Sequence, residues 1–145
     1  MQNPPGPPQS NPPGPPHSNP PATTSSGVDK KTGSTLSYLF WWITGLIFLF
    51  VGKNDPDIKF HAAQSIVFFG GITVVRIVLA LIGAFLPAGV GLVLGLISLL
   101  ILLFALVVWA MAMYKAWTTG GSRFELPIVG SFVAPYAEQL AAAVK

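Results

Sequence analysis

The chain has 145 residues, of which 52% are hydrophobic and only 9% are charged, and its mean hydropathy is +0.63. Charged residues make up about 25% of an ordinary soluble domain, so this composition excludes a soluble enzyme and indicates a membrane protein. The absence of cysteine excludes disulfides and thiolate chemistry, and a net charge of +3 spread over the whole chain makes no nucleic-acid-binding surface.

Residues 1–34 are predicted to form a disordered tail. Ten of the fourteen prolines lie in the first 21 residues, where the octapeptide at Asn3–Ser10 recurs at Asn11–Ser18. A segment so rich in proline and glycine has no side chains for a core and is expected to stay extended. We expect it to be a solvated spacer. The alternative is that its Pro-x-x-Pro spacings dock a proline-reading domain.

Residues 35–119 are predicted to form a three-helix membrane domain. The apolar segments lie at about 35–52, 65–86 and 91–114, and each is near the roughly 20 residues that a helix needs to cross about 30 Å of hydrocarbon. Because the bilayer core offers no water to backbone groups, all three should be α-helices. Asp55 before Pro56 is typical of a helix start, so the second helix should begin near Pro56.

Residues 120–145 are predicted to form a turn followed by a short helix over about Val133–Val144, with Glu138 and Gln139 on its polar side. This helix is too short for a fourth span and is expected to lie at the membrane interface. The predicted fold class is an all-α integral membrane protein. It has three transmembrane helices, a C-terminal interfacial helix and a disordered proline-rich N-terminal tail.

Three spans would place the two termini on opposite sides of a cell membrane, plasma or inner. On that topology four cations share one side, namely Lys53, Lys59, Lys115 and Arg123. Lys30 and Lys31 would lie on the other side. The excess of positive charge favours a cytoplasmic first loop and C-terminus, with the proline-rich tail outside.

Arg76 is the charged side chain that a membrane span does not explain. It lies close to the bilayer centre, where a cation costs about 2.5–3.5 kcal/mol. At helical spacing it shares one face with Ser65, Phe69, Ile72, Ala80 and Gly83, with His61 at the edge, so polar and small residues lie on this face. Such a face predicts helix packing or a cavity lining. Arg76 is therefore a candidate contact for an anion, a substrate or a translocated protein; the alternative is an arginine bonded to carbonyls or lipid phosphate.

His61 lies beside Gln64 and Ser65 and is a candidate proton carrier. The simpler interpretation is a hydrogen-bonding residue at the interface. A metal site needs several ligands, and the only other histidine, His17, is in the tail. We therefore expect no metal site, no cofactor and no catalytic residue.

Gly91 and Gly95 have the spacing of a close-packing motif of membrane helices. In the preceding span, Gly70, Gly71 and Gly83 are the positions that could receive them. This pattern predicts contact between the second and third spans.

Three stretches together carry a family resemblance. They are Leu36–Leu39 with Thr44–Leu49, then Lys59–Ile66, which contains Phe-His-Ala-Ala-Gln-Ser, and then Lys115–Trp117 with Phe124–Gly130, which ends Leu-Pro-Ile-Val-Gly. They resemble a family of small, uncharacterised multi-pass membrane proteins of bacteria and archaea. That family is grouped distantly with the roughly twenty-kilodalton Tic component of the chloroplast inner-envelope import translocon.

The resemblance covers about residues 34–140 and implies a fold and a membrane location. It supplies no catalytic residue. The motif positions that it singles out are Phe60, His61, Gln64, Leu126, Pro127 and Gly130.

These observations predict a non-enzymatic multi-pass membrane protein of the lipid bilayer. It would be an assembly or protein-translocation-associated subunit that associates with itself or with other membrane proteins. One alternative is a small transporter or channel component in which Arg76 and His61 contact an anionic solute. Another is a membrane-tethered docking protein whose tail binds a proline-reading domain.

Overall fold

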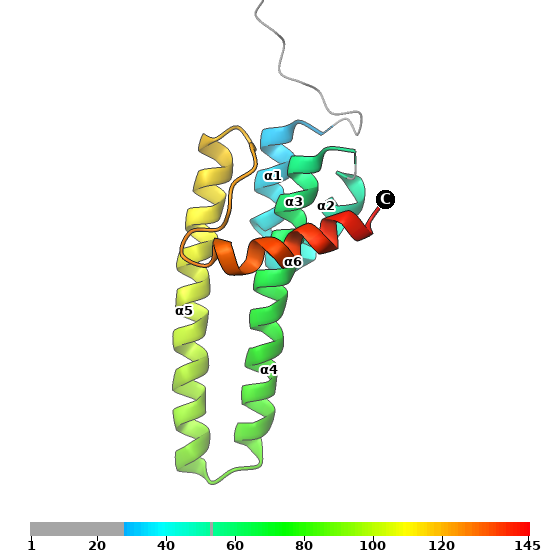
Figure 1. The fold of residues 1–145 in the computed structure, drawn as a ribbon. Coiled ribbons are helices and arrows are strands. Elements are labelled where there is room, and N and C mark those ends of the chain that lie inside the picture. The colour runs from blue at the N-terminus through cyan, green and yellow to red at the C-terminus, as the bar shows by residue number, and fades with distance from the viewer. Residues whose placement is uncertain (1–27, 53) are drawn as a thin grey trace, which may run out of the picture.

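The computed structural model describes residues 28–52 and 54–145, and all its regular elements are helices. The repeats of the proline-rich tail, with their predicted docking spacing, lie outside the described residues, as does Lys53. The helices are α1 (Lys30–Leu39), α2 (Trp41–Val51), α3 (Pro56–Ser65), α4 (Gly71–Ala84), α5 (Ala88–Thr118) and α6 (Gly130–Ala143). A wider helical turn at Ile66–Gly70 joins α3 to α4 without a break. The prediction of an all-α fold is confirmed (Figure 1).

The start of α3 follows from its capping residues. The carboxylate of Asp55 accepts hydrogen bonds from the backbone N–H groups of Asp57 (2.8 Å) and Ile58 (3.1 Å). Pro56 occupies the first helical position, where the missing N–H costs nothing. The helix begins at the residue that the sequence predicted.

Two helices are long and apolar enough to cross a membrane. They are the continuous helix Pro56–Ala84, with 29 residues, and Ala88–Thr118, with 31 residues. They are antiparallel and are joined by a short turn after Ala84, forming the α4–α5 hairpin that projects from the other helices (Figure 1). None of the residues of α4 is buried, and no residue of α5 before Ala105 is buried. The hairpin therefore exposes apolar side chains along its length.

The first predicted span is not one helix. The backbone leaves the helical conformation at Phe40, and Trp41 has a positive φ of 59°. The segment predicted at 35–52 is thus divided between α1 and the 11-residue α2. At about 1.5 Å per residue, neither piece crosses the hydrocarbon core. Among the described residues, two helices and not the expected three are therefore long and apolar enough to cross a membrane.

The break is stable because other residues bind the backbone groups that it frees. The indole N–H of Trp109 donates to the carbonyl of Tyr38 (2.8 Å), and the hydroxyl of Ser65 donates to the carbonyl of Trp41 (2.7 Å). The hydroxyl of Thr44 accepts from the N–H of Phe40 (3.1 Å). Non-helical backbone in an apolar setting is tolerated where protein groups satisfy it in this way.

Because of the break, the chain reverses direction between α1 and α2. Gly33 near the start of α1 and Gly52 after the end of α2 both pack against Ile58. Lys30 forms an ion pair with Asp57 of α3, and the hydroxyl of Ser34 donates to the carbonyl of Gly121 (3.1 Å). The start of α1 therefore lies at the same end of the molecule as the first loop.

This placement corrects the expectation for Lys30 and Lys31. Three spans would have put both lysines opposite the first loop, but Lys30 pairs with Asp57 and Lys31 lies 3.7 Å above the ring of Trp117 at the end of α5. In addition, α1 begins within the stretch assigned to the tail, since Asp29 caps it by accepting from the N–H of Thr32.

The C-terminal helix α6 crosses the other helices where α3 passes into α4 (Figure 1). It starts three residues before the predicted helix, and Val133, Ala134 and Ala137 are buried on one side of it. Phe132 and Tyr136 are exposed on another side. Fourteen residues rise about 21 Å, so α6 is too short to be a span. We call α1, α2, α3, α6 and the part of α5 after Ala105 the head.

Candidate functional site

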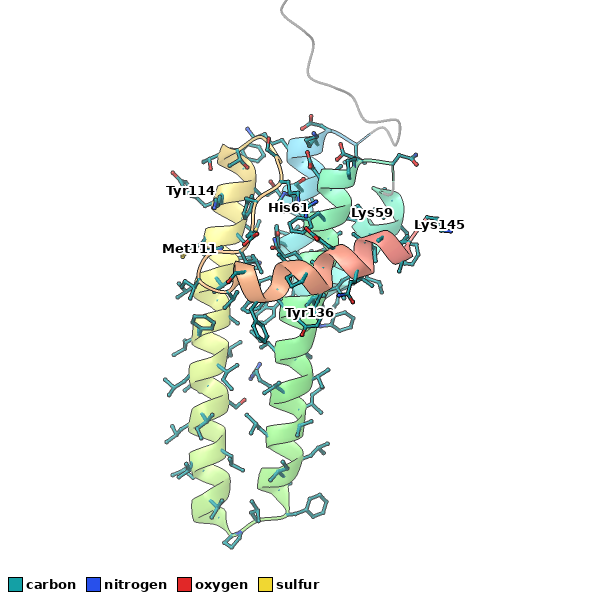
Figure 2. The ribbon with its side chains drawn as sticks, in the orientation of Figure 1. Lys59, His61, Met111, Tyr114, Tyr136 and Lys145 are labelled. Atoms are coloured by element: carbon teal, nitrogen blue, oxygen red, sulfur yellow. The ribbon has the colours of Figure 1, made fainter. Side chains whose placement is uncertain are left out.

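The interior of the head contains a fully buried group of polar side chains, Tyr38, His61 and Gln64, each with no exposed surface. We call these three residues the polar clamp. Tyr38 comes from α1, and the other two lie one helical turn apart on α3. Figure 2 shows His61 inside the head, whereas Tyr114 and Tyr136 point outward.

The polar clamp binds the backbone of the loop between α5 and α6. The imidazole Nε2 of His61 lies 3.1 Å from the carbonyl oxygen of Ser122. The amide of Gln64 donates to the carbonyl of Phe124 (3.3 Å) and accepts from the N–H of Leu126 (3.1 Å). Two residues of α3 therefore hold the 122–126 segment through its main chain.

The hydrogen-bond pattern fixes the protonation of the clamp. A carbonyl only accepts, so the Nε2 of His61 must carry the proton that it shares with Ser122. Its Nδ1 is then an acceptor, and the hydroxyl of Tyr38 donates to it (3.0 Å). The Tyr38 oxygen in turn accepts from the amide nitrogen of Gln64 (2.9 Å). His61 is thus a neutral imidazole with both nitrogens occupied, a geometry that favours hydrogen bonding over proton transfer.

Aromatic packing surrounds the clamp. The ring of Phe124 lies 4.7 Å from the imidazole of His61, and the ring of Phe60 lies 6.0 Å from it on another side. The guanidinium of Arg123 lies 3.9 Å from the ring centre of Phe60 and forms an ion pair with Glu138 of α6. These contacts fasten α6 to α3.

The structure brings the motif positions of the two distant stretches into one place. Phe60, His61 and Gln64 lie on α3, and Gln64 binds Leu126 directly. Pro127 begins the turn that leads to α6, and Gly130 packs against Glu125 with no room for a Cβ atom. The pattern that marks the family resemblance is therefore the clamp and the loop that it holds.

Sequence reasoning missed Tyr38, Trp109 and the loop carbonyls. Tyr38 lies within the Leu36–Leu39 stretch of the resemblance, which is the one signal that could have pointed to it. Ser65 does not belong to the clamp, because its hydroxyl binds Trp41 at the break between α1 and α2.

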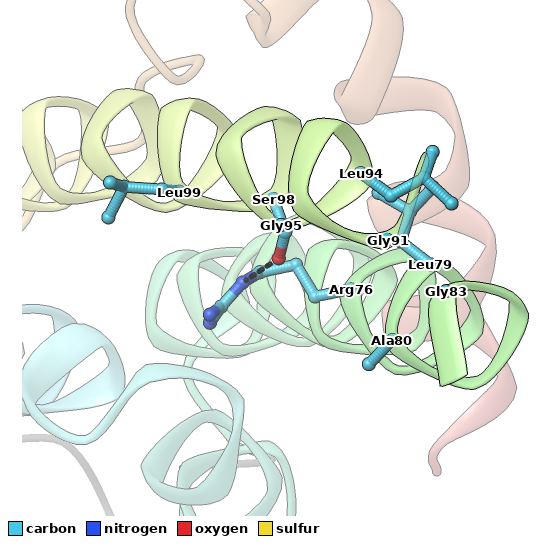
Figure 3. A pocket seen from close by; sticks show the side chains of 9 residues that line it. All are labelled: Arg76, Leu79, Ala80, Gly83, Gly91, Leu94, Gly95, Ser98 and Leu99. Carbon is cyan, nitrogen blue, oxygen red and sulfur yellow. Dashed lines mark hydrogen bonds between the residues drawn. The ribbon is translucent and has the colours of Figure 1, made fainter. Parts of the chain in front are cut away.

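Arg76 lies far from the clamp, in a cavity of about 440 Å³ between α4 and α5. Its Nε donates to the hydroxyl of Ser98 (3.1 Å) across the hairpin (Figure 3). Ala80 and Gly83, from the same predicted face, line this cavity with residues of α5. His61 and Ser65 are instead buried in the head, and Phe69 is buried in the wider helical turn between α3 and α4. Some residues of the predicted face therefore pack in the interior and others line the cavity. Arg76 and His61 do not lie in the same site.

The predicted glycine contact between the spans forms at one position. A Cβ on Gly91 would lie 3.0 Å from the carbonyl oxygen of Gly83, so these glycines let the two helices meet near the turn. Gly95 has no heavy atom within 4 Å of its Cβ position and lines the cavity instead. Gly70 lies near Trp42, and Gly71 has nothing within 4 Å.

Among the described residues, the charged side chains other than Arg76 lie in the head and its loops. Asp57 raises the pKa of the Lys30 amino group above its ordinary value by accepting its hydrogen bond.

Over residues 28–52 and 54–145, no group of three or more His, Asp or Glu side chains has the arrangement of a metal site.

Comparison with known proteins relates the chain to membrane proteins of archaea. Residues 29–133 match the magnetosome magnetite crystal formation protein family. A UPF0132 membrane protein of Methanocaldococcus jannaschii is 39% identical over 115 residues, which cover 79% of this chain and 94% of the relative. A UPF0132 membrane protein of Archaeoglobus fulgidus is 36% identical over 104 residues, or 70% of this chain and 88% of the relative. No solved structure matches the chain.

Proposed function

Since this chain belongs to the UPF0132 membrane protein family, we propose that it is a non-enzymatic assembly subunit, anchored by the α4–α5 hairpin and presenting the head at one membrane surface. The observation that carries the proposal is the apolar surface of the hairpin, where Leu81 and Leu100 are 58% and 66% exposed. Such a continuous surface needs lipid or other apolar helices around it.

The length of the hairpin supports this placement. Between Ala88 and Ala105, where burial in the head begins, α5 rises about 26 Å, close to the roughly 30 Å of a hydrocarbon core. The head would then lie at the interface. There the exposed side chains of Phe40 before α2, Ile43 in α2 and Phe132 in α6 would contact the outer part of the lipid.

The charge distribution supports an orientation with the head in the cytoplasm. The described lysines and arginines outside the hairpin all belong to the head and its loops, namely Lys30, Lys31, Lys59, Lys115, Arg123 and Lys145. The turn at the far end of the hairpin, residues 85–90, carries no charge. By the positive-inside rule the first loop, the C-terminus and the start of α1 would all face the cytoplasm.

The polar clamp supports a structural role for the head. Among the described residues, every buried side-chain nitrogen and oxygen has a hydrogen-bond partner. The polar groups of His61 and Gln64 bind Tyr38 and the backbone of the loop and leave none free for a ligand. The clamp would thus make the head rigid, and a rigid head would present a defined surface to other subunits.

Photo-crosslinking tests the assembly role. A photoreactive residue at Val78 or Leu100, both exposed on the hairpin, should yield discrete protein adducts in cells, either with a second copy or with another membrane protein. Adducts with subunits of a protein-conducting complex would support the translocation-associated form of the proposal. The same probe at Tyr114 of the head provides the comparison. A strictly monomeric protein in mild detergent, with adducts to lipid alone, would contradict the proposal.

The cavity at Arg76 favours a second candidate, a small transporter or channel component for an anionic solute. His61 has no part in it, because it lies in the head. Arg76→Leu separates the two proposals in proteoliposomes. Loss of anion flux would support transport, whereas unchanged flux together with higher membrane stability would exclude it.

The docking hypothesis for the tail is a third candidate. Residues 3–21 lie outside every described helix, so their deletion removes no residue of one. Loss of a captured partner on deletion would support a proline-reading interaction, and an unchanged set of partners would remove it.

A further inference from the structure

The space between α4 and α5 is lined by one cation, one hydroxyl and otherwise apolar groups. Arg76 and Ser98 supply its polar groups, and Leu79, Leu94 and Leu99 are among its apolar lining. The contact of Gly83 with Gly91 lies at the turn side of this space. Its volume is about 440 Å³, whereas a water molecule occupies about 30 Å³. A single small inorganic anion would leave most of the space empty.

The guanidinium of Arg76 has unused hydrogen-bonding capacity. Its Nε donates to Ser98, and among the described residues its two Nη groups have no partner. The α4–α5 hairpin supplies no carboxylate, because the chain has no Asp or Glu from residue 58 to residue 124. A cation placed in hydrocarbon without a counter-charge is costly, so this site calls for an anion from outside the chain.

The direction of the side chain indicates where that anion comes from. The side chain of Arg76 extends from α4 past Ser98 and toward the level of Leu99 on α5. This is the direction of the head and leads away from the turn that joins α4 to α5 (Figure 3). Long cationic side chains reach toward the headgroup layer in this way. The two Nη groups form a planar pair of donors, which matches two oxygens of a phosphate.

We propose that this cavity binds the phosphodiester of an anionic phospholipid from the leaflet at which the head lies. The Nη groups of Arg76 donate to two phosphate oxygens, and Ser98 holds the guanidinium in position through its Nε. The acyl chains lie along Leu79, Leu94 and Leu99, which line the same space. This inference rests on the membrane placement of the hairpin in the proposed function.

The test is lipid retention by the full-length protein, measured by native mass spectrometry after extraction from nanodiscs. We expect wild type to retain one phosphatidylglycerol in preference to phosphatidylcholine, and Arg76→Leu to lower that retention about tenfold or more. Arg76→Lys should retain an intermediate amount, because a point charge replaces a planar pair of donors.

Two glycine variants test the cavity while leaving Arg76 in place. Gly95→Leu fills the space, since nothing lies within 4 Å of its Cβ position, and should lower retention as Arg76→Leu does. Gly89→Leu is the matched control: its Cβ position is equally open, but Gly89 does not line the cavity, so retention should stay at the wild-type level.

Three outcomes would overturn the inference. Equal retention by wild type and Arg76→Leu would show that the arginine does not bind the lipid. Unchanged retention by Gly95→Leu would place the lipid elsewhere. If inorganic phosphate raises the melting temperature of the protein as much as phosphatidylglycerol does, that result would show that the site binds a soluble anion. Labelling of a cysteine at Ala88 reports insertion separately, so failure of the membrane placement is distinguishable from failure of the lipid site.

Discussion

The amino group of Lys30 lies 2.7 Å from the carboxylate of Asp57, which joins the start of α1 to the start of α3. Because this hydrogen bond raises the pKa of the Lys30 amino group above its ordinary value, Lys30 is charged at neutral pH. The stability that this pair contributes is present below the ordinary lysine pKa and is lost only as the pH rises above it. Two segments held together in this way lie on the same side of any membrane.

Cysteine labelling tests this topology, since the chain has no native cysteine. Single cysteines at Ser10, Ala88 and Thr119 would be treated with an impermeant maleimide in intact cells. Ser10 and Thr119 should be protected together, and Ala88 at the turn of the hairpin should be labelled. Opposite behaviour of Ser10 and Thr119 would restore the topology of three spans.

Gln64→Leu should destabilise the head. The substitution leaves the N–H of Leu126 and the carbonyl of Phe124 buried without their partner, and each unsatisfied group costs about 1–3 kcal/mol. We expect a loss of about 2 kcal/mol or more in detergent unfolding. Gln139→Leu changes an exposed glutamine on α6 and is the matched control. Equal stability of the two variants would mean that the clamp does not hold the loop.

Tyr38→Phe should alter His61 without moving it. The variant keeps the ring but removes the hydroxyl that donates to Nδ1 and accepts from Gln64. Nitrogen NMR of wild type should show the tautomer protonated at Nε2, and the Nδ1 resonance should shift in the variant. Tyr136→Phe removes an exposed hydroxyl and should leave that resonance unchanged. Protonation of wild type at Nδ1 would refute the assigned hydrogen bonds.

Gly121→Ala should be far more destabilising than Gly120→Ala. Both glycines have positive φ, 78° and 66°, so both variants incur a similar backbone cost of about 1 kcal/mol. A Cβ on Gly121 would also overlap the backbone of Lys30, whereas one on Gly120 meets nothing within 4 Å. The difference in melting temperature between the two variants measures the packing of the loop on α1. Equal melting temperatures would argue against this contact.

Gly91→Leu should separate the helices of the hairpin near its turn, because its Cβ position is 3.0 Å from the carbonyl of Gly83. We expect faster proteolysis at the turn and a lower melting temperature. Gly89→Leu, which meets no atom within 4 Å at its Cβ, should behave as wild type apart from a small gain in helix propensity. If the two variants have the same melting temperature, the contact between Gly83 and Gly91 does not stabilise the hairpin.

Local signals in the sequence predicted much of the fold. Asp55 and Pro56 marked the start of α3, and the two longest apolar stretches became the two long helices. The break at Phe40 could not be predicted in the same way, because Leu39–Val51 is apolar except for Thr44 and Gly45 and has no charge or proline to mark a break. That break depends on Ser65 and Trp109, which reach it only in the folded chain.

The candidate site was predictable only in part. The helical face of Arg76 follows from spacing alone, and Ala80 and Gly83 share its cavity. The clamp instead joins α3 to backbone groups about 60 residues away along the chain. A hydrogen bond to a backbone carbonyl leaves no periodic pattern in the sequence, so it could not be predicted from residue spacing. The family resemblance identified the motif positions of the clamp. Only the folded structure shows that they bind the backbone of the loop between α5 and α6.

The turn at Phe85–Pro87 bears on how the chain enters a membrane. With the head on one side, the part that must pass to the far side is a short uncharged turn and the apolar ends of α4 and α5. Under the proposed placement, no other part of the described residues has to cross, and Arg76 is the one described cation that would enter the lipid. If the two helices insert together as a hairpin, as the proposed placement implies, little polar surface of the described residues would pass through the bilayer.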